Sequence, residues 1–453
     1  MAEAEKAPEV YPILGTMTFG AEGQVKPQEA SVIIRSFVGS DCAKVPGLEG
    51  RVMVDTARVY QQATPDGDTE STLGEIFSMF PSLERRSSIA TKASSGVAPL
   101  FSLSRQSVID QCNLSLEKLG IDCVDLFYLH WPDVKTHIDE TLAGVKHLHS
   151  EGKICEFGLS NFPAWAVVDI WYRCKAQGMV LPTVYQGMYN VITRSIEPEI
   201  VPVARQFGLR LYMYNPLAGG LLSGRYSTME DIAAATQGRF SSEFDNAFGG
   251  RMKAGTEVYR ARYSKQPLFD ALRILHEAID AANSADDSVA AADADASAVA
   301  AKVVEEAAGT VVQEMSHTVN GVRFQVRVEE TTVASRAGDK AWNMANVALR
   351  WLIHHSLLTK GDGIILGVSR KEHLVANLAA WQGGPLPETL VDACERAWEA
   401  ARPACEAYFR GFGAKPGGIE EFLRVKAEER EAAEPTAAEN EDASESAKRA
   451  RKA

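Results

Sequence analysis

Polar residues follow several short apolar segments in this chain, and their side-chain types could act together on a carbonyl group. Asp55 ends the run at 52–54, Tyr60 follows five residues later, and Lys92 and His130 end two further runs. An adjacent ammonium lowers a tyrosine pKa, ordinarily near ~10, because it stabilises the phenolate. Asp55 would keep Lys92 charged and oriented, and His130 could donate to a carbonyl oxygen. We therefore expect Tyr60 to be a general acid that protonates a carbonyl oxygen as hydride arrives at carbon.

None of these side chains can carry hydride, so the pattern requires a cofactor. The stretch Asn215–Arg225 follows another apolar segment, and its glycines would let it lie along a pyrophosphate. It nearly matches a nucleotide P-loop, but Arg225 and Tyr226 replace the expected Lys and Ser/Thr, which argues against ATP. Ser369-Arg370-Lys371 opens a predicted helix, and a helix amino terminus with two cations suits the 2′-phosphate of NADP. An ordinary basic helix start explains that stretch equally well.

Eight predicted strands and alternating helices would position these residues. The strands are expected at 11–20, 52–54, 88–92, 124–129, 154–159, 183–185, 209–214 and 363–368. The helices are expected at 29–37, 70–80, 107–119, 141–149, 164–177, 196–207, 341–354 and 374–381. The polar residues at the strand ends are Asp55, Lys92, His130, Ser160, Asn161, Gln186, Asn215 and Ser369.

This alternation predicts an α/β fold, a TIM (β/α)8 barrel, whose strands gather their carboxyl ends at one rim. An open doubly wound sheet is the alternative, disfavoured because no Gly-x-Gly-x-x-Gly follows an early strand. Residues 1–10 are expected to form an N-terminal tail and 11–412 the barrel. A low-complexity insertion is expected at about 281–338, with a hairpin pattern over 318–333. The charged tail 413–453 is expected to be disordered, although its basic end could instead be a nuclear import signal.

Composition limits the classes of partner and compartment. The 453 residues carry a net charge of −13, which disfavours nucleic acid as a partner. No apolar run reaches the ~18 residues of a membrane span, and the amino terminus lacks the apolar core of a secretory signal. Seven cysteines without a Cys-x-x-Cys pair favour a reducing compartment, so the cytoplasm is expected. No strand supplies a His-x-His pair, which disfavours a metal-dependent hydrolase built on His130 and Asp55.

Several stretches resemble a known family. Asp55-Thr-Ala-x-x-Tyr60, Lys92 and Leu126–His130 resemble the catalytic tetrad of the aldo-keto reductases. Three longer stretches are similar to the aflatoxin-aldehyde (succinic semialdehyde) reductase branch: Leu181–Asn190, Tyr214–Arg225 and Ile364–Ser369.

The resemblance implies reduction of aldehydes, or of dicarbonyls, with hydride from NADPH to the carbonyl carbon and the proton from Tyr60. It implies a cofactor site that consists of Asp55, Ser160, Asn161, Gln186, Asn215, Pro216, Leu217, Gly219, Gly220, Leu221, Ser223, Gly224, Arg225, Arg239, Ser369, Arg370, His373 and Asn377. It also implies a substrate site at His130, Tyr259, Arg262 and Arg410, where a guanidinium would suit a carboxylate.

Three features depart from that branch. Arg370 and His373 replace its usual Ser and Gln, the loop 61–69 is longer, and the chain continues for 43 residues beyond Arg410. A cofactor-binding redox sensor or channel-subunit-like protein with little turnover is the alternative function, although all four catalytic residue types favour an enzyme. The expected partner is a small aldehyde or dicarbonyl, without nucleic acid, metal or membrane, and a homodimer is left open.

Overall fold

Eight parallel strands close into a barrel in the computed structural model, which describes residues 10–20, 24–45, 50–60, 69–95, 101–241, 254–285, 315–319, 322–326 and 342–410. Their spatial order is β1, β10, β7, β6, β5, β4, β3, β2. The barrel strands are β1 (Tyr11–Gly15), β2 (Val52–Asp55), β3 (Ser87–Ala93), β4 (Val124–Leu129), β5 (Ile154–Ser160), β6 (Pro182–Met188), β7 (Arg210–Tyr214) and β10 (Gly363–Gly367). Val54 of β2, for example, pairs with Leu14 on one side and Ile89 on the other. The expected (β/α)8 barrel is confirmed.

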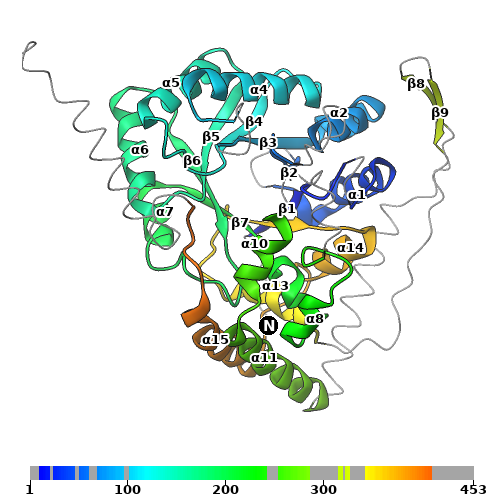
Figure 1. The fold of residues 1–453 in the computed structure, drawn as a ribbon. Helices are drawn as coiled ribbons and strands as arrows, with labels where there is room; N and C mark the ends of the chain where they lie inside the picture. The colour runs from blue at the N-terminus through cyan, green and yellow to red at the C-terminus, as the bar shows by residue number, and fades with distance from the viewer. Residues whose placement is uncertain are drawn as a thin grey trace, which may run out of the picture.

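Helices cover the outside of the barrel (Figure 1). The helices that alternate with the barrel strands are α1 (Pro27–Gly39), α2 (Thr69–Met79), α4 (Arg105–Leu119), α5 (Ile138–Ser150), α6 (Ala164–Ala176), α7 (Ile200–Phe207), α13 (Met344–His354) and α14 (Lys371–Ala379). Local sequence explains their limits. The Ser104 side chain accepts from the Ser107 N–H at the start of α4, and Gly120 ends this helix at φ 69°, which glycine adopts without a Cβ clash.

Apolar side chains fill the barrel interior, so the barrel is a packed core and not a pore. The interior side chains are Tyr11, Ile13, Met53, Ala90, Leu126, Tyr128, Val184, Tyr212 and Ile365. A second apolar layer, with Leu14, Val54 and Phe127 among its members, separates the strands from the helices. Because both faces of the strands are buried, polar side chains collect at the strand ends.

Two predicted strands differ from the structure by more than one residue at an end. The strand expected at 11–20 ends at Gly15, because the Phe19 N–H donates to the Thr16 carbonyl in a turn. The strand expected at 183–185 extends over β6, so Gln186 lies within it and not after it.

Three longer helices were not expected from the sequence. They are α10 (Ala254–Tyr263), α11 (Gln266–Ala285) and α15 (Glu388–Ala401), while α3 (Pro81–Arg85) and α8 (Met229–Ala233) are short. Helix α11 packs against α15 beside the barrel (Figure 1). Its buried residues Leu268, Leu272, Leu275 and Ile279 have helical spacing, so the signal was present in the sequence.

Two hydrogen bonds join Asn283, near the end of α11, to Trp342, just before α13. Asn283 donates from Nδ2 to the Trp342 carbonyl and accepts at Oδ1 from the Trp342 N–H, both at 2.9 Å. Helix α11 ends at Ala285, so it extends into the insertion that the sequence predicts from about residue 281. Strands β8 (Met315–Val319) and β9 (Val322–Val326) form an antiparallel pair, which confirms a hairpin over a shorter span than expected. The rest of the expected insertion and the tail 413–453 lie outside the described residues.

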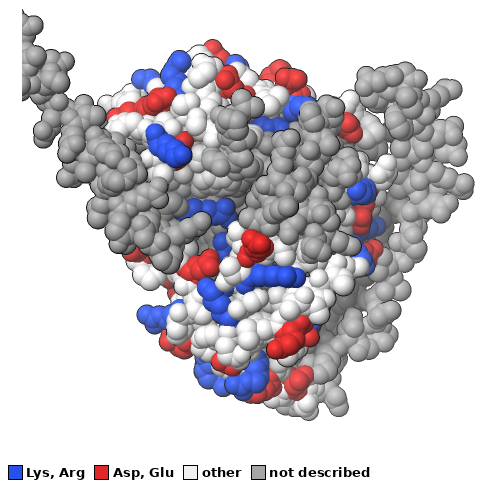
Figure 2. Space-filling view, viewed as in Figure 1, with Lys and Arg blue, Asp and Glu red and all other residues white. Residues whose placement is uncertain are grey.

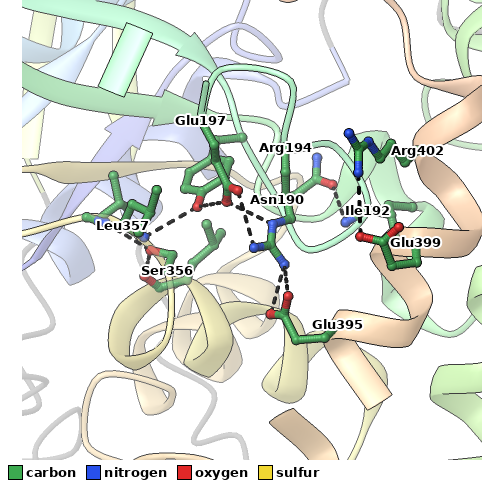
Figure 3. A network of polar contacts seen from close by, with 12 residues as sticks. Asn190, Ile192, Arg194, Glu197, Ser356, Leu357, Glu395, Glu399 and Arg402 are labelled. Atoms are coloured by element: carbon green, nitrogen blue, oxygen red, sulfur yellow. Dashed lines mark hydrogen bonds and ion pairs between the residues drawn. The ribbon is translucent and has the colours of Figure 1, made fainter. Parts of the chain in front are cut away.

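A polar network ties the loop after β6 to the last helix (Figure 3). Arg194 donates from Nε to Glu197 and from Nη1 to both carboxylate oxygens of Glu395 on α15, each at 2.8 Å. Its guanidinium also lies 4.8 Å from the centre of the Trp351 ring. The network positions α15, and with it the chain that follows, next to the carboxyl end of the barrel.

Candidate active site

The barrel brings Asp55, Lys92 and Gln186 into one hydrogen-bonded group, as their positions at strand ends predict. Lys92 Nζ lies 2.5 Å from Asp55 Oδ1 and 2.6 Å from the Thr56 carbonyl oxygen. Gln186 donates from Nε2 to Asp55 Oδ2 at 2.8 Å. Lys92 and Asp55 are 0% and 3% exposed. Burial raises the pKa of Asp55 and lowers that of Lys92, and the ion pair between them opposes both shifts.

Tyr60 lies beside this group, in the connection that follows β2. The centre of its ring is 5.3 Å from Lys92 Nζ and 5.8 Å from the centre of the His130 ring. Burial and then Asp55 raise the pKa of Tyr60 well above its ordinary value, while Arg239 lowers it. The expected lowering of the Tyr60 pKa was wrong, because burial and the negative charge of Asp55 together outweigh the positive charges near the ring. A raised pKa keeps the Tyr60 hydroxyl protonated at neutral pH, which a proton donor requires.

The surroundings of His130 favour its neutral form. Its Nδ1 lies 2.8 Å from Ser94 Oγ, and Gln111 Oε1 accepts from the Ser94 N–H at 2.9 Å. Burial lowers the pKa of His130 well below its ordinary value, and the charges of Lys92 and Arg410 lower it further. A neutral ring that accepts from the Ser94 hydroxyl at Nδ1 carries its proton on Nε2. Such a ring can donate one hydrogen bond to a substrate oxygen.

Asn161 connects the ends of three strands. Its backbone has φ 61°, an uncommon conformation for a residue other than glycine. Its Nδ2 donates to the His130 carbonyl and to Ser160 Oγ, both at 2.9 Å, and its Oδ1 accepts from the Tyr214 hydroxyl at 2.7 Å. Ser160 and Asn161 therefore lie at the same rim as His130, as expected.

The loop after β7 turns through a series of left-handed residues. Asn215, Ala218, Gly219, Gly220 and Gly224 have φ values of 60°, 50°, 70°, 103° and 79°. Such turns direct successive N–H groups into a concave surface that binds anions. The backbone of this loop therefore fits a phosphate group.

The side chains of the same loop point in different directions. Pro216 and Leu221 are buried and Leu217 is partly buried, whereas Ser223 and Arg225 are exposed. Leu221 can thus face a ligand only through its backbone, while Arg225 can reach one with its guanidinium.

Positive charge gathers near the start of α14. Burial lowers the pKa of His373, and the guanidinium groups of Arg370 and Arg225 lower it further, which places both arginines close to this ring. Ser369 Oγ lies 3.2 Å from His373 Nδ1, and Asn377 is buried on the same helix. A helix amino terminus beside two guanidinium groups favours a phosphate.

Arg239 lies against Tyr259 of α10. Its Nη1 donates to the Tyr259 hydroxyl at 2.6 Å, and its guanidinium lies 5.1 Å from the centre of that ring. A Cβ on Gly219 would lie 2.8 Å from the Tyr259 ring, so only glycine allows this approach. Tyr259 therefore packs against the loop expected to bind the cofactor.

The two arginines expected at the substrate mouth lie in different surroundings. The Arg262 side chain is 12% exposed, and its Nε lies 3.4 Å from Glu406 Oε2. Arg410 is exposed, and its guanidinium lies 5.4 Å from the centre of the Trp131 ring, whose centre is 4.2 Å from that of the His130 ring. Arg262 thus already has a carboxylate partner.

Three groups near the site were not expected from the sequence. They are Ser94, which binds His130; Glu406, which pairs with Arg262; and a buried ion pair between Arg58 and Glu70. Arg58 and Glu70 lie on either side of Tyr60 in the sequence, and their opposite charges could have indicated an ion pair there. The sequence around Glu406 contains no comparable indication of its partner.

The described surface shows further properties. Lys and Arg side chains are interspersed with Asp and Glu on the face in Figure 2. Among the described residues, no group of three or more His, Cys, Asp or Glu side chains could hold a metal ion. Each helix in the described ranges is too short or too polar to cross a bilayer.

Comparisons with known proteins agree with this geometry. A family model described as "Aldo/keto reductase family" matches residues 13–399. The chain is 36% identical over 400 residues to "Aflatoxin B1 aldehyde reductase member 2" of Rattus norvegicus, which covers 88% of this chain and 87% of that protein. It is 35% identical over 402 residues to "Aldo-keto reductase family 7 member A3" of Homo sapiens, which covers 88% of this chain and 96% of that protein.

Proposed function

The chain belongs to the aldo/keto reductase family, and from this premise we propose that it reduces aldehydes to alcohols with NADPH as the cofactor. The observation that carries the proposal is the position of Tyr60 beside the buried Asp55–Lys92 pair and the neutral ring of His130. The relatives named as aflatoxin B1 aldehyde reductases support an aldehyde as the substrate. A dicarbonyl would present the same reacting group.

Each of these residues has a separate role in the proposed reaction. His130 donates from Nε2 to the substrate carbonyl oxygen and positions it. Tyr60 gives its proton to that oxygen, and its raised pKa keeps the proton available at neutral pH. Lys92, held by Asp55, places a positive charge beside the phenolate that remains. Bound NADPH supplies the hydride.

The proposed cofactor site fits the donors that the rim presents. Gln186 offers polar atoms next to Asp55, Ser160 and Asn161 offer others at the same rim, and the left-handed loop Asn215–Arg225 suits a pyrophosphate. The groups proposed for the additional phosphate of NADP are Arg225, Arg239, Ser369, Arg370, His373 and Asn377. Because the charges of Arg370 and Arg225 both act on His373 at the start of α14, we propose NADPH in preference to NADH.

The test is Tyr60→Phe, with Tyr172→Phe on the exposed face of α6 as the matched control. Steady-state rates are measured on a panel of aldehydes and dicarbonyls, and NADPH binding is measured by fluorescence. We expect Tyr60→Phe to lose at least ~10²-fold in turnover with nearly unchanged NADPH binding, and the control to behave like the wild type. A variant that keeps a tenth of wild-type turnover would contradict the role of Tyr60. Oxidation of one cofactor equivalent without steady turnover in the wild type would instead indicate a redox sensor.

We propose the cytosol as the compartment. All seven cysteines are free thiols, which is the usual state in a reducing environment. A homodimer stays a prediction, for which sedimentation of the purified chain is the measurement.

A further inference from the structure

The segment that follows α15, residues 402–410, is held in place against several barrel connections. Its hydrogen bonds are Cys405 Sγ to the Ile192 carbonyl at 3.2 Å, Ser195 Oγ to the Glu406 carbonyl at 3.3 Å, the Ala164 N–H to the Tyr408 hydroxyl at 3.0 Å, and the Arg410 N–H to the Asn161 carbonyl at 3.0 Å. The Arg194 network in Figure 3 fixes the helix that precedes the segment. The backbone of Glu406 therefore has a defined position.

The Glu406 side chain lies between two cations. Its Oε2 is 3.4 Å from Arg262 Nε, and its Oε1 is 3.5 Å from Lys265 Nζ. Lys265 is held in turn by the Ala404 carbonyl, to which it donates at 3.0 Å. Glu406 is 41% exposed, whereas Arg262 is only 12% exposed. The carboxylate thus covers the charge of a largely buried guanidinium from the solvent side.

Arg262 shares two aromatic neighbours with Tyr60 of the proposed reaction centre. Tyr214 and Tyr259 are within electrostatic range of both Tyr60 and Arg262. The centre of the Tyr259 ring is 5.9 Å from the Arg262 guanidinium carbon. A substrate that extends from Tyr60 past the Tyr259 ring would therefore approach Arg262.

We infer that Glu406 is a specificity-determining residue, which occupies the charge of Arg262 and weakens the binding of aldehydes that carry a carboxylate. The inference rests on the proposed aldehyde reduction at Tyr60. A substrate carboxylate has to displace Glu406 from Arg262 or lie beside a like charge. Glu406 thus takes the position that a substrate anion would otherwise occupy, and an uncharged aldehyde of the same length has no such competitor.

The test compares 4-oxobutanoate with butanal, which differ by one carboxylate. The measured quantity is the ratio of their kcat/KM values in the wild type, Glu406→Gln and the control Glu399→Gln, which removes an exposed carboxylate that pairs with Arg402. We expect Glu406→Gln to raise the ratio by roughly 5-fold in favour of 4-oxobutanoate, the upper range for a solvent-exposed pair. Glu399→Gln should leave the ratio unchanged.

Two further variants determine whether the gain arises at Arg262. Glu406→Ala should change the ratio in the same direction as Glu406→Gln. Arg262→Ala combined with Glu406→Gln should abolish the gain, because the guanidinium that becomes available has been removed. An unchanged ratio in Glu406→Gln, or a gain that survives the loss of Arg262, would overturn the inference.

A binding measurement separates this inference from the proposed function. Calorimetry gives the affinity for butanoate, an unreactive carboxylate, with and without NADP⁺. Tighter butanoate binding in Glu406→Gln than in the wild type supports the role of Glu406, even if neither aldehyde is reduced. Equal butanoate affinity in the two proteins contradicts it, whereas a lack of turnover with both aldehydes contradicts only the proposed function.

Discussion

Replacement of Lys92 by Met should destabilise the protein by an amount that depends on pH. The ammonium is 0% exposed and lies 2.5 Å from Asp55 Oδ1. Met fills a similar volume, so the main change is electrostatic: Asp55 keeps its hydrogen bond from Gln186 but loses its counter-ion. Breaking a buried ion pair by removing one partner typically costs about 3–5 kcal/mol.

The chemistry of Asp55 sets an upper limit on this cost. A carboxylate that is too costly to bury takes up a proton, and its unfolded-state pKa is about 3.9. Keeping Asp55 protonated in the folded state costs at most ~4 kcal/mol at pH 7 and ~1.5 kcal/mol at pH 5. Because burial already raises the folded-state pKa of Asp55 and loss of Lys92 raises it further, the contribution of protonated Asp55 to stability is present at low pH and lost as the pH rises.

The assay is urea unfolding of Lys92→Met and of Asp55→Asn/Lys92→Met at pH 5, 6 and 7. Both variants lack the ammonium, so its effect on the pKa of His130 is common to both. We expect the double variant to be more stable, with a difference that grows by up to ~1.4 kcal/mol per pH unit. If the two variants lose stability in parallel across this range, Asp55 is not the buried charge that Lys92 compensates, and the reasoning fails.

Three other perturbations test separate contacts. Arg370→Ala should weaken NADPH binding by about 1.5–3 kcal/mol and leave NADH binding unchanged, as fluorescence titration would show; equal loss for both cofactors would exclude a 2′-phosphate contact. The free energy of unfolding of the wild type should fall as the pH drops below about 6.5, because His130 takes up a proton only in the unfolded state. In His130→Gln, urea unfolding should show a slope of this free energy against pH that is smaller by up to ~1.4 kcal/mol per pH unit. Glu70→Gln leaves the buried Arg58 without its carboxylate and should cost about 3–5 kcal/mol of unfolding free energy, against less than ~1 kcal/mol for the exposed Glu399→Gln.

The barrel and its rim could be predicted because both depend on local patterns. Each barrel strand is a short apolar run, and a polar residue such as Asp55 or Lys92 comes at or near its end. The parallel topology then brings these ends together without further information. The helix α15 was missed although Leu390, Cys394 and Ala397 have helical spacing, because it follows the eighth expected unit.

Other properties of the site depend on contacts that no local pattern contains. The Tyr60 pKa is raised by burial and by the charge of Asp55, and both depend on tertiary packing. Glu406 meets Arg262 across 144 positions of sequence. Such a pair between an exposed and a buried side chain has no sequence signature, since either residue alone would be assigned to the solvated surface.

The paired hydrogen bonds between Asn283 and Trp342 make the base of the insertion a natural site for protein engineering. They bring together two residues that lie 59 positions apart in the sequence. Doubling the length of a flexible loop costs only about 0.6 kcal/mol in closure entropy. A reporter or affinity module grafted between these two residues should therefore fold as an independent unit and leave the reductase barrel intact, provided that its own termini lie close together.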